Sequence, residues 1–347
     1  MTWKGRVVHQ LARVASAGPW RSAIESVAVG IGHRYPTSRV CHSFCKHFGW
    51  HLARCEHKHF ERIATLSWGG GKMHCGSDAS LAEVTRLYYF LGAIPAADEI
   101  AVARLFNRVL REGDVFFDVG ANVGFYTFLA ASHVGRCGSV HAFEANAALL
   151  PHLLRSRRFN TFPDRITVTH AVVGQKEEQT QIFYLPADPA LIGASSVHLH
   201  PWLGAGVGTE VPAVTIDRYV HDKRLAHVDV IKIDIEGGEL AAFQGMRETF
   251  THTPPLLIVC ELMPDVVTLG DGKPQQRASS AASSTEVVNF LQMRGYQPWH
   301  IRTRDGTLDR IVGQREIERL CGATMNVAFV SPSLRRLRPK TFFVDGG

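Results

Sequence analysis

Long hydrophobic runs are missing from the sequence. No stretch of eighteen or more apolar residues occurs in its 347 positions, and the segment SAIESVAVGIG at residues 22–32 is too short and too polar to span a bilayer. We therefore expect no transmembrane segment. Hydrophobic residues nevertheless make up 45% of the chain, which is enough for one large domain with an extension or for two modest domains.

Acidic residues are scarce at one end of the chain. Residues 1–60 hold nine Lys or Arg against two Asp or Glu, whereas the rest of the chain is nearly balanced, at 29 against 30. A local positive charge attracts phosphates, anionic lipids or nucleic acids. Because the basic residues form no dense cluster, we interpret them as a solvated surface and expect no nucleic-acid partner.

The cysteines do not indicate a disulfide framework. They number seven, which is odd. Cys137 and Cys260 fall in segments predicted to lie at the rim or in the interior of a core, where a thiol behaves as a small apolar group. Because free thiols suit a reducing compartment, we expect a cytoplasmic protein. A possible zinc-ligand set lies within residues 41–60: Cys41, His42, Cys45, His47, His51, Cys55, His57 and His59. Structural zinc sites usually present their ligands in closely spaced pairs, of the form Cys-x₂₋₄-Cys and His-x₃₋₅-His. Residues 55–59 instead alternate like a strand edge, so we expect a His-rich basic surface and no bound metal.

Strand and helix patterns alternate regularly after residue 96. A helical pattern within residues 96–114 leads into apolar strands predicted at 114–120, 138–144, 165–173, 227–235 and 255–262, with helices at 124–134, 147–159 and 237–250. A helix at 285–296 and strands at 297–303 and 324–331 close the pattern, and 175–208 and 270–284 are expected to be a polar insertion and a surface loop. This order predicts an α/β fold with a parallel sheet. We divide the chain into a basic, Cys/His-rich extension or cap at 1–90, a main domain at 91–335 and a tail at 336–347.

The first motif that carries chemistry is DVFFDVGANVGFYTF, residues 114–128. Asp118 ends a strand, and Gly120 and Gly124 allow a tight turn into the next helix. The dinucleotide fingerprint G-x-G-x-x-G has a glycine where this chain has Asn122. A carboxylate just before the turn would repel a phosphate, whereas it suits a cationic nucleoside such as S-adenosylmethionine.

The second motif is HAFEAN, where Glu144 ends the next strand. An acid at this position can accept both ribose hydroxyls of a nucleoside. Asn146 is the better candidate for the N-cap of a helix from Ala147 onward, which leaves Glu144 free for binding. Ala171, at the end of the third strand, is expected near the adenine ring.

The third motif is VDVIKIDIEGGEL, residues 228–240. Lys232, Asp234 and Glu236 alternate with isoleucines along the predicted strand, so they are expected on one side of it. Charged residues are unusual in a doubly covered parallel strand, so this cluster predicts a site. Glu239 is interpreted as a structural acid in the first turn of a helix.

Together, FFDVGANVGFYT, VHAFEAN, VTIDRYV and VDVIKIDIEGGELAAFQGM resemble the FkbM family of S-adenosylmethionine-dependent methyltransferases, over roughly residues 95–332. The resemblance implies a class I methyltransferase (Rossmann-like) fold, with a seven-stranded, mostly parallel sheet, helices on both faces and an N-terminal extension. It also implies methyl transfer, usually to oxygen. The family often has Glu-Pro where this chain has Glu144 followed by Ala145. The expected cofactor-binding residues are Asp118, Gly120, Ala121, Asn122, Gly124, Glu144, Ala145, Asn146, Ala171 and Asp234.

The expected catalytic residues are Lys232, Asp234 and Glu236. Asp234 or Glu236 would remove the proton of an acceptor hydroxyl, and Lys232 would keep Asp234 ionised or orient the acceptor. Asp234, Glu236 and Glu261 could instead hold Mg²⁺, which we do not expect to be required. The acceptor is expected to be a hydroxyl on a sugar, glycan or secondary metabolite, and Ser195, Ser196, His198 and His200 are candidates to line its pocket.

Two alternatives remain at this point. One is a nicotinamide-dependent oxidoreductase on a related fold, against which the missing middle glycine argues. The other is a non-catalytic binding protein that uses its basic N-terminal region, against which the acids at the predicted strand ends argue. The sequence does not indicate an oligomeric state.

Overall fold

The structure is a computed structural model that describes residues 21–35, 62–75, 96–177, 179–187, 193–268, 274–311, 313–322 and 325–333, with isolated positions 10, 38, 41, 43–45, 47–48 and 91–92. Residues 55–59, predicted as a strand edge, and the predicted tail at 336–347 lie outside the described residues, as do five members of the Cys/His set (His42, His51, Cys55, His57 and His59). In the described part of the chain, no helix is both long and apolar enough to cross a membrane.

A mostly parallel sheet forms the centre of the molecule. Its strands, in spatial order, are β14 (Leu308–Arg310), β13 (Gln297–Ile301), β15 (Met325–Val330), β10 (Leu257–Leu262), β9 (Val230–Ile233), β3 (Val115–Val119), β4 (Ser139–Glu144) and β5 (Ile166–His170). The strands from β10 to β5 are parallel to one another, while β15 is antiparallel to both β10 and β13. The predicted fold is confirmed with one correction, since β14 adds an eighth strand to the predicted seven.

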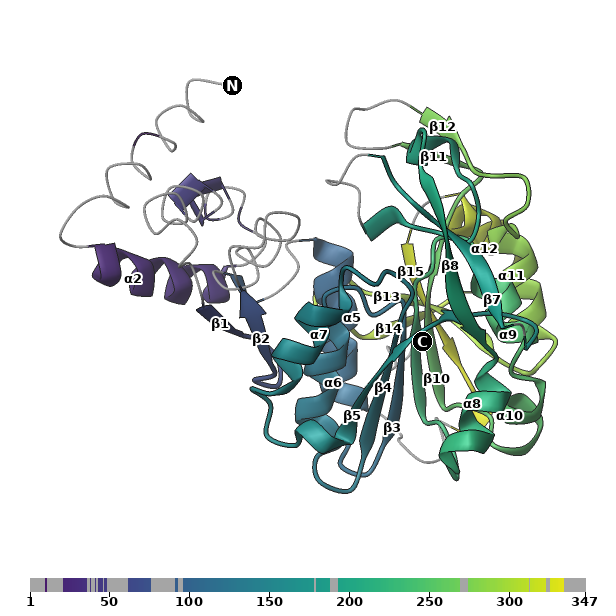
Figure 1. Ribbon diagram of the computed structural model, residues 1–347, viewed down its shortest axis with the longest axis horizontal. Coiled ribbons are helices and arrows are strands. Elements are labelled where there is room, and N and C mark those ends of the chain that lie inside the picture. Colours follow the sequence, from purple (N-terminus) through teal and green to yellow (C-terminus); the bar gives the residue numbers. More distant parts are fainter. Residues whose placement is uncertain are drawn as a thin grey trace.

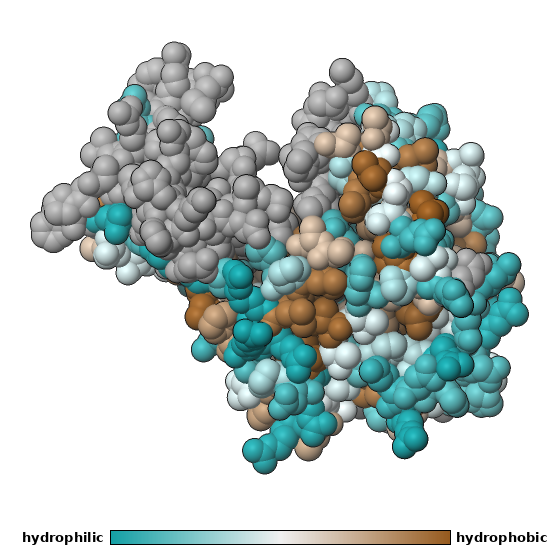
Figure 2. Space-filling model, in the orientation of Figure 1, coloured by the Kyte–Doolittle hydropathy of each residue, from teal (hydrophilic) through white to brown (hydrophobic). Residues whose placement is uncertain are grey.

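Helices cover both faces of this sheet (Figure 1). One face carries α5 (Ala97–Val109), α6 (Phe125–Val134) and α7 (Leu150–Arg157), and the other carries α8 (Ile216–Lys223), α9 (Glu239–Gln244), α10 (Arg247–His252), α11 (Ser284–Gln292) and α12 (Gln314–Cys321). Two separate hydrophobic cores fill the two sides, because the central strands are apolar on both faces. The outer surface over α8 and α10 is mainly hydrophilic, whereas hydrophobic side chains gather nearer the middle of the same view (Figure 2).

Helix α7 is shorter than predicted. It begins at Leu150, and Pro151, which has no N–H to lose, lies in its first turn. The predicted N-cap role of Asn146 is therefore wrong. Its side-chain oxygen instead accepts a hydrogen bond from the Ala148 N–H at 3.0 Å, within the turn that precedes the helix.

A second sheet lies partly in segments that were expected to be loops, and its strand β6 (Val172–Val173) takes the end of the strand predicted at 165–173. β6, β8 (Val207–Val214) and β7 (Thr180–Leu185) form this sheet, so the predicted polar insertion at 175–208 includes β7 and the start of β8. The short helix η4 (Pro201–Leu203) lies between them, and η2 (Pro163–Arg165) precedes β5. The predicted surface loop at 270–284 contains β12 (Pro274–Gln276), which pairs with β11 (Val266–Thr268).

The described part of the N-terminal extension packs onto the main domain. It contains α2 (Arg21–Arg34) and the hairpin β1 (Arg62–Thr65) and β2 (Lys72–Cys75). Asn160, just after α7, bonds both backbone groups of Lys72 at 2.9 Å, and Ser156 accepts the His74 N–H at 2.9 Å. The division into three parts stays a prediction, but the extension shares a hydrophobic core with α5 and α6.

Candidate functional site

A cavity of about 250 Å³ opens where the central parallel strands end. The sequence-predicted residues that line it are Gly120, Ala121, Asn122, Glu144, Ala145, Ala171, Asp234 and Glu236. Those that do not line it are Asp118, Gly124, Asn146 and Lys232. Ser195 also lines the cavity, whereas the other loop candidates, Ser196, His198 and His200, do not. The sequence motifs therefore meet at one cavity, although several of their residues support its walls from behind.

The loop between β3 and α6 forms one wall. Its Gly120 and Ala121 N–H groups donate to the Phe143 carbonyl of β4, at 3.0 and 2.9 Å. Gly120 has φ of +85°, and a Cβ there would lie 1.9 Å from the Asp234 carbonyl oxygen. Gly124 has φ of +92°, and a Cβ there would lie 2.4 Å from the Phe128 ring. Both glycines are therefore required sterically, and Gly120 lets the ends of β3 and β9 meet.

Glu144 joins this loop to the end of β4. Its two carboxylate oxygens accept the backbone N–H groups of Asn122 and Asn146, each at 2.7 Å. The side chain is 6% exposed, and burial raises its pKa to about 7 although these hydrogen bonds favour the charged form. Each oxygen retains a second lone pair for a ligand hydroxyl.

Asp118 lies beneath the loop. It is 2% exposed, and its carboxylate accepts the Thr127 hydroxyl of α6. Burial raises its pKa to about 6, against the effects of Thr127 and Lys232. We expected this charge to face a cationic ligand, but the structure places Asp118 away from the cavity, where it fixes the start of α6.

Lys232 is a buried cation surrounded by acids. Its ammonium lies 3.3 Å from Asp234 Oδ2 and over the Tyr126 ring, 5.6 Å from the centroid. Burial opposes its charge, but Asp234, Glu99 and Glu261 outweigh that effect and raise its pKa. Burial also opposes ionisation of Asp234, yet Lys232 and hydrogen bonds from Glu261 and Lys232 lower the pKa of Asp234. Asp234 is therefore an ionised partner of Lys232 and a weak base.

Glu236 differs from Asp234 in both backbone and charge. Because β9 ends at Ile233, the predicted alternation along one strand is wrong for Glu236, which lies in a turn with φ of +52°. Burial, together with the nearby Asp234 and Glu239, raises the pKa of Glu236 well above its usual range. Glu239 accepts the Ile235 and Gly237 N–H groups at 3.1 and 3.2 Å, consistent with its structural interpretation.

Glu99 and Tyr126 also line the cavity, with Asn326 behind them, and none of the three was predicted from the sequence. The Tyr126 hydroxyl donates to Glu99, and Asn326 Nδ2 donates to the other Glu99 oxygen at 3.2 Å. Asn326 lies opposite Glu261 in the β10–β15 pairing. Glu99 is one of two acids in the first turn of the amphipathic helix α5, whereas Asn326 had no signal in its own segment.

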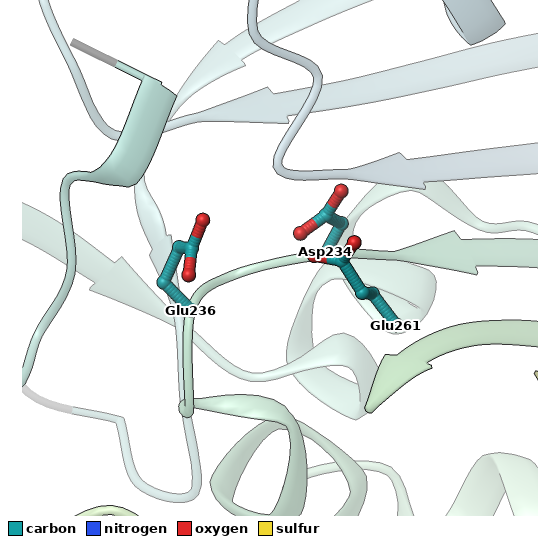
Figure 3. Close-up of side chains that lie close together, drawn as sticks. All are labelled: Asp234, Glu236 and Glu261. Carbon is teal, nitrogen blue, oxygen red and sulfur yellow. The ribbon is translucent and has the colours of Figure 1, made fainter. Parts of the chain in front are cut away.

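Three carboxylates near the cavity could hold a cation. Ligand atoms of Asp234, Glu236 and Glu261 all lie within 4.8 Å of one another. Figure 3 shows Asp234 and Glu261 at the ends of neighbouring strands, with Glu236 on the turn that follows Asp234. Hard divalent cations prefer such oxygen ligands. The ammonium of Lys232 already neutralises part of this charge, so the donor set fits a metal without requiring one.

Residues 118–298, more than half of the chain, match the model of the family described as the methyltransferase FkbM domain. The chain belongs to the FkbM methyltransferase family. Membership and the strand order together establish a class I methyltransferase fold, and the oxidoreductase alternative is not favoured. Glu99 and Asn326 lie outside the matched FkbM residues, whereas the motifs from Asp118 to Glu261 lie within them.

Solved structures of other methyltransferases are similar to the chain at low identity. An FkbM methyltransferase from Methylobacillus flagellatus is 15% identical, with 91% of this chain and 61% of that chain covered and a TM-score of 0.35. A precorrin-6y C5,15-methyltransferase from Geobacter metallireducens is 13% identical, with coverages of 67% and 88% and a TM-score of 0.35. Fibrillarin from Aeropyrum pernix, solved with bound S-adenosyl-L-methionine, is 11% identical, with coverages of 78% and 82% and a TM-score of 0.35. Among curated proteins, none matches this FkbM-family chain.

Proposed function

We propose that the protein is an S-adenosylmethionine-dependent O-methyltransferase that acts on a hydroxyl of a sugar, glycan or secondary metabolite. One observation carries this proposal. A single cavity joins Glu144, an acid suited to ribose hydroxyls, with Glu236, an acid of raised pKa suited to accept a proton. Binding and proton transfer would therefore take place side by side.

The residues around Glu144 fit the nucleoside part of S-adenosylmethionine. Each oxygen of Glu144 has a lone pair left for a ligand, and the neighbouring Asn146 Nδ2 is buried with no hydrogen-bond partner among the residues that the structure describes. The described residues that line the cavity include four acids, Glu99, Glu144, Asp234 and Glu236, and no Lys, Arg or His. Such a lining favours a cation over a phosphate. When bound, S-adenosylmethionine would supply an electrophilic methyl group.

The protein's own residues would prepare the acceptor hydroxyl. We assign the general base to Glu236, because Asp234 is committed to Lys232 and has a lowered pKa. Burial and the neighbouring acids raise the pKa of Glu236, so its carboxylate binds a proton more readily than that of Asp234. Asp234 and Lys232 would then orient the acceptor in the cavity, and neither of them would take its proton.

The acidic lining of the cavity supports a proposal about the partners, and the free thiols support one about the location. We propose a small-molecule or glycan acceptor and no nucleic-acid partner, because polyphosphates would be repelled near the reacting group. We also propose a cytoplasmic location, which the free, buried thiols of Cys45 and Cys260 support.

The cofactor assignment can be tested by calorimetry with S-adenosylhomocysteine, using Glu144→Gln. Loss of one carboxylate oxygen should weaken binding at least tenfold, because an amide nitrogen cannot accept a ribose hydroxyl. Glu210→Gln, an exposed change on β8, is the matched control and should leave binding unchanged. Equal affinities of wild type and Glu144→Gln would contradict the assignment.

The base can be tested with a panel of hydroxylated sugars and polyketides as acceptors. Glu236→Gln should bind S-adenosylhomocysteine as wild type does but lower kcat by about 10²-fold or more, which is typical of losing a general base. Asp234→Asn should lower kcat less. If Glu236→Gln turned over at the wild-type rate, the base would lie elsewhere.

A further inference from the structure

The turn after β9 has a backbone conformation that its sequence does not favour. Glu236 has φ of +52°, in the left-handed region that residues other than glycine rarely adopt, and Gly237 follows with φ of +98°. Such a conformation persists only where the surrounding structure holds it. In this protein it decides where the Glu236 side chain points, and Glu236 lines the cavity.

Two buried side chains bond the backbone of this turn. The Glu236 carbonyl oxygen accepts the Ser196 hydroxyl at 2.7 Å and His200 Nε2 at 2.9 Å. Ser196 and His200 are 0% and 1% exposed. Both lone pairs of this carbonyl are therefore used.

His200 is itself fixed in one orientation. The Ala278 N–H donates to its Nδ1 at 3.0 Å, so Nε2 must carry the proton that goes to Glu236. Its ring stacks on Trp202, with centroids 4.1 Å apart and planes 7° from parallel. His200 therefore joins its own segment, between β7 and β8, to the segment after β12.

We propose that His200 and Ser196 are positioning residues, which hold the left-handed backbone of Glu236 so that its carboxyl group faces the cavity. Both were expected to line the acceptor pocket, but they lie one layer behind the cavity wall. Their effect on turnover rests on the proposed function, in which Glu236 is the base. Their effect on the backbone does not.

Three variants of the full chain separate the contacts of His200 and Ser196. His200→Phe keeps a ring on Trp202 but loses both hydrogen bonds, whereas His200→Gln keeps one donor and one acceptor. Ser196→Ala removes the second donor with a minimal change in volume, and so covers the case in which His200→Phe does not fold. His221→Phe, at a histidine whose side chain is 84% exposed on α8, is the matched control.

Selective labelling gives a direct readout of the turn. With ¹³C-carbonyl Glu and ¹⁵N Gly, the two Glu-Gly peptide bonds of the sequence give signals, Glu112-Gly113 and Glu236-Gly237. His200→Phe and Ser196→Ala should move the second signal and leave the first in place, and His200→Gln should return it toward the wild-type position. His221→Phe should move neither.

Turnover should follow the same pattern. His200→Phe should lower kcat at least tenfold with the affinity for S-adenosylhomocysteine within twofold of wild type, and His200→Gln should recover most of the loss. The proposal is overturned if the Glu236-Gly237 signal stays in place in both His200→Phe and Ser196→Ala, or if Gln is no better than Phe. A wild-type protein that does not bind S-adenosylhomocysteine would contradict the proposed function instead, and the labelled signal would still test the turn.

Discussion

The two halves of the cavity are built in different ways. At the half that we propose for the cofactor (the cofactor half), Glu144 is satisfied by backbone N–H groups from two short adjacent motifs, at Asn122 and Asn146. At the half that we propose for the acceptor (the acceptor half), Lys232, Asp234 and Glu236 are surrounded by acids from other elements, including Glu99 and Glu261. The first half depends on backbone shape. The second depends on the balance between one buried cation and a surplus of acids.

Lys232→Met should have the largest effect, because it removes the cation from the acceptor half alone. Asp234, Glu99 and Glu261 would be left without their partner, and loss of one member of a buried ion pair typically costs about 3–5 kcal/mol of unfolding free energy. Urea unfolding at pH 8 measures this cost. Lys223→Met, on the exposed surface of α8, should change stability by less than about 0.5 kcal/mol.

A double variant sharpens that measurement. Asp234→Asn combined with Lys232→Met should recover part of the loss, because the double variant leaves one fewer unpaired acid. A cost below about 1 kcal/mol for Lys232→Met would show that the acids stay protonated without their cation.

Gly120→Ala should have the next largest effect, because Gly120 is where the two halves touch. The added Cβ would meet the Asp234 carbonyl oxygen in a backbone with φ of +85°. Gly295 has the same φ of +85° but open space around it, so Gly295→Ala isolates the conformational cost, about 1 kcal/mol.

We expect Gly120→Ala to cost about 3 kcal/mol in urea unfolding and to weaken S-adenosylhomocysteine binding more than tenfold. Gly295→Ala should bind normally. Equal costs for the two variants would mean that the ends of β3 and β9 can separate freely.

The same contrast explains how much could be predicted from the sequence. The order of strands and helices and the cofactor half were predictable because Gly120, Asn122 and Glu144 lie within 25 residues of one another at strand ends. Parallel strands bring their carboxyl ends together, so chain order alone places such residues at one edge.

The acceptor half was only partly predictable. Lys232 and Asp234 stood out as charges in an apolar strand, but the turn at Glu236 ended the alternation that was expected there. His200 and Asn326 could not be assigned, because their roles depend on contacts with Glu236 and Glu99 across large separations in the chain. The buried position of Asp118 behind the cavity wall was not predicted, because electrostatic suitability does not indicate which way a side chain faces.

The pH dependence of stability separates Glu144 from exposed acids. Its pKa rises from 4.5 to about 7 on folding, so the folded state favours the protonated form. The corresponding stabilisation is complete below pH 4.5 and is lost as the pH rises toward 7.

Glu144→Gln should therefore remove a decline of about 2 kcal/mol between pH 5 and 7, as measured by urea unfolding without ligand. Glu286, in the capping box of α11, has a lowered pKa, so Glu286→Gln should leave the slope in this range unchanged. A Glu144→Gln variant with the wild-type slope would mean that Glu144 is ionised throughout.

Removal of divalent metal should have the smallest effect. Asp234 already accepts hydrogen bonds from Lys232 and Glu261, and a dication among Asp234, Glu236 and Glu261 would lie close to the Lys232 ammonium. Repulsion between the two cations opposes metal binding. We therefore expect EDTA or added Mg²⁺ to change kcat and S-adenosylhomocysteine affinity by less than about twofold in wild type. Lys232→Met removes the repulsion and should bind Mg²⁺ more tightly in calorimetry, whereas loss of wild-type turnover in EDTA would show that the acceptor half is a metal site.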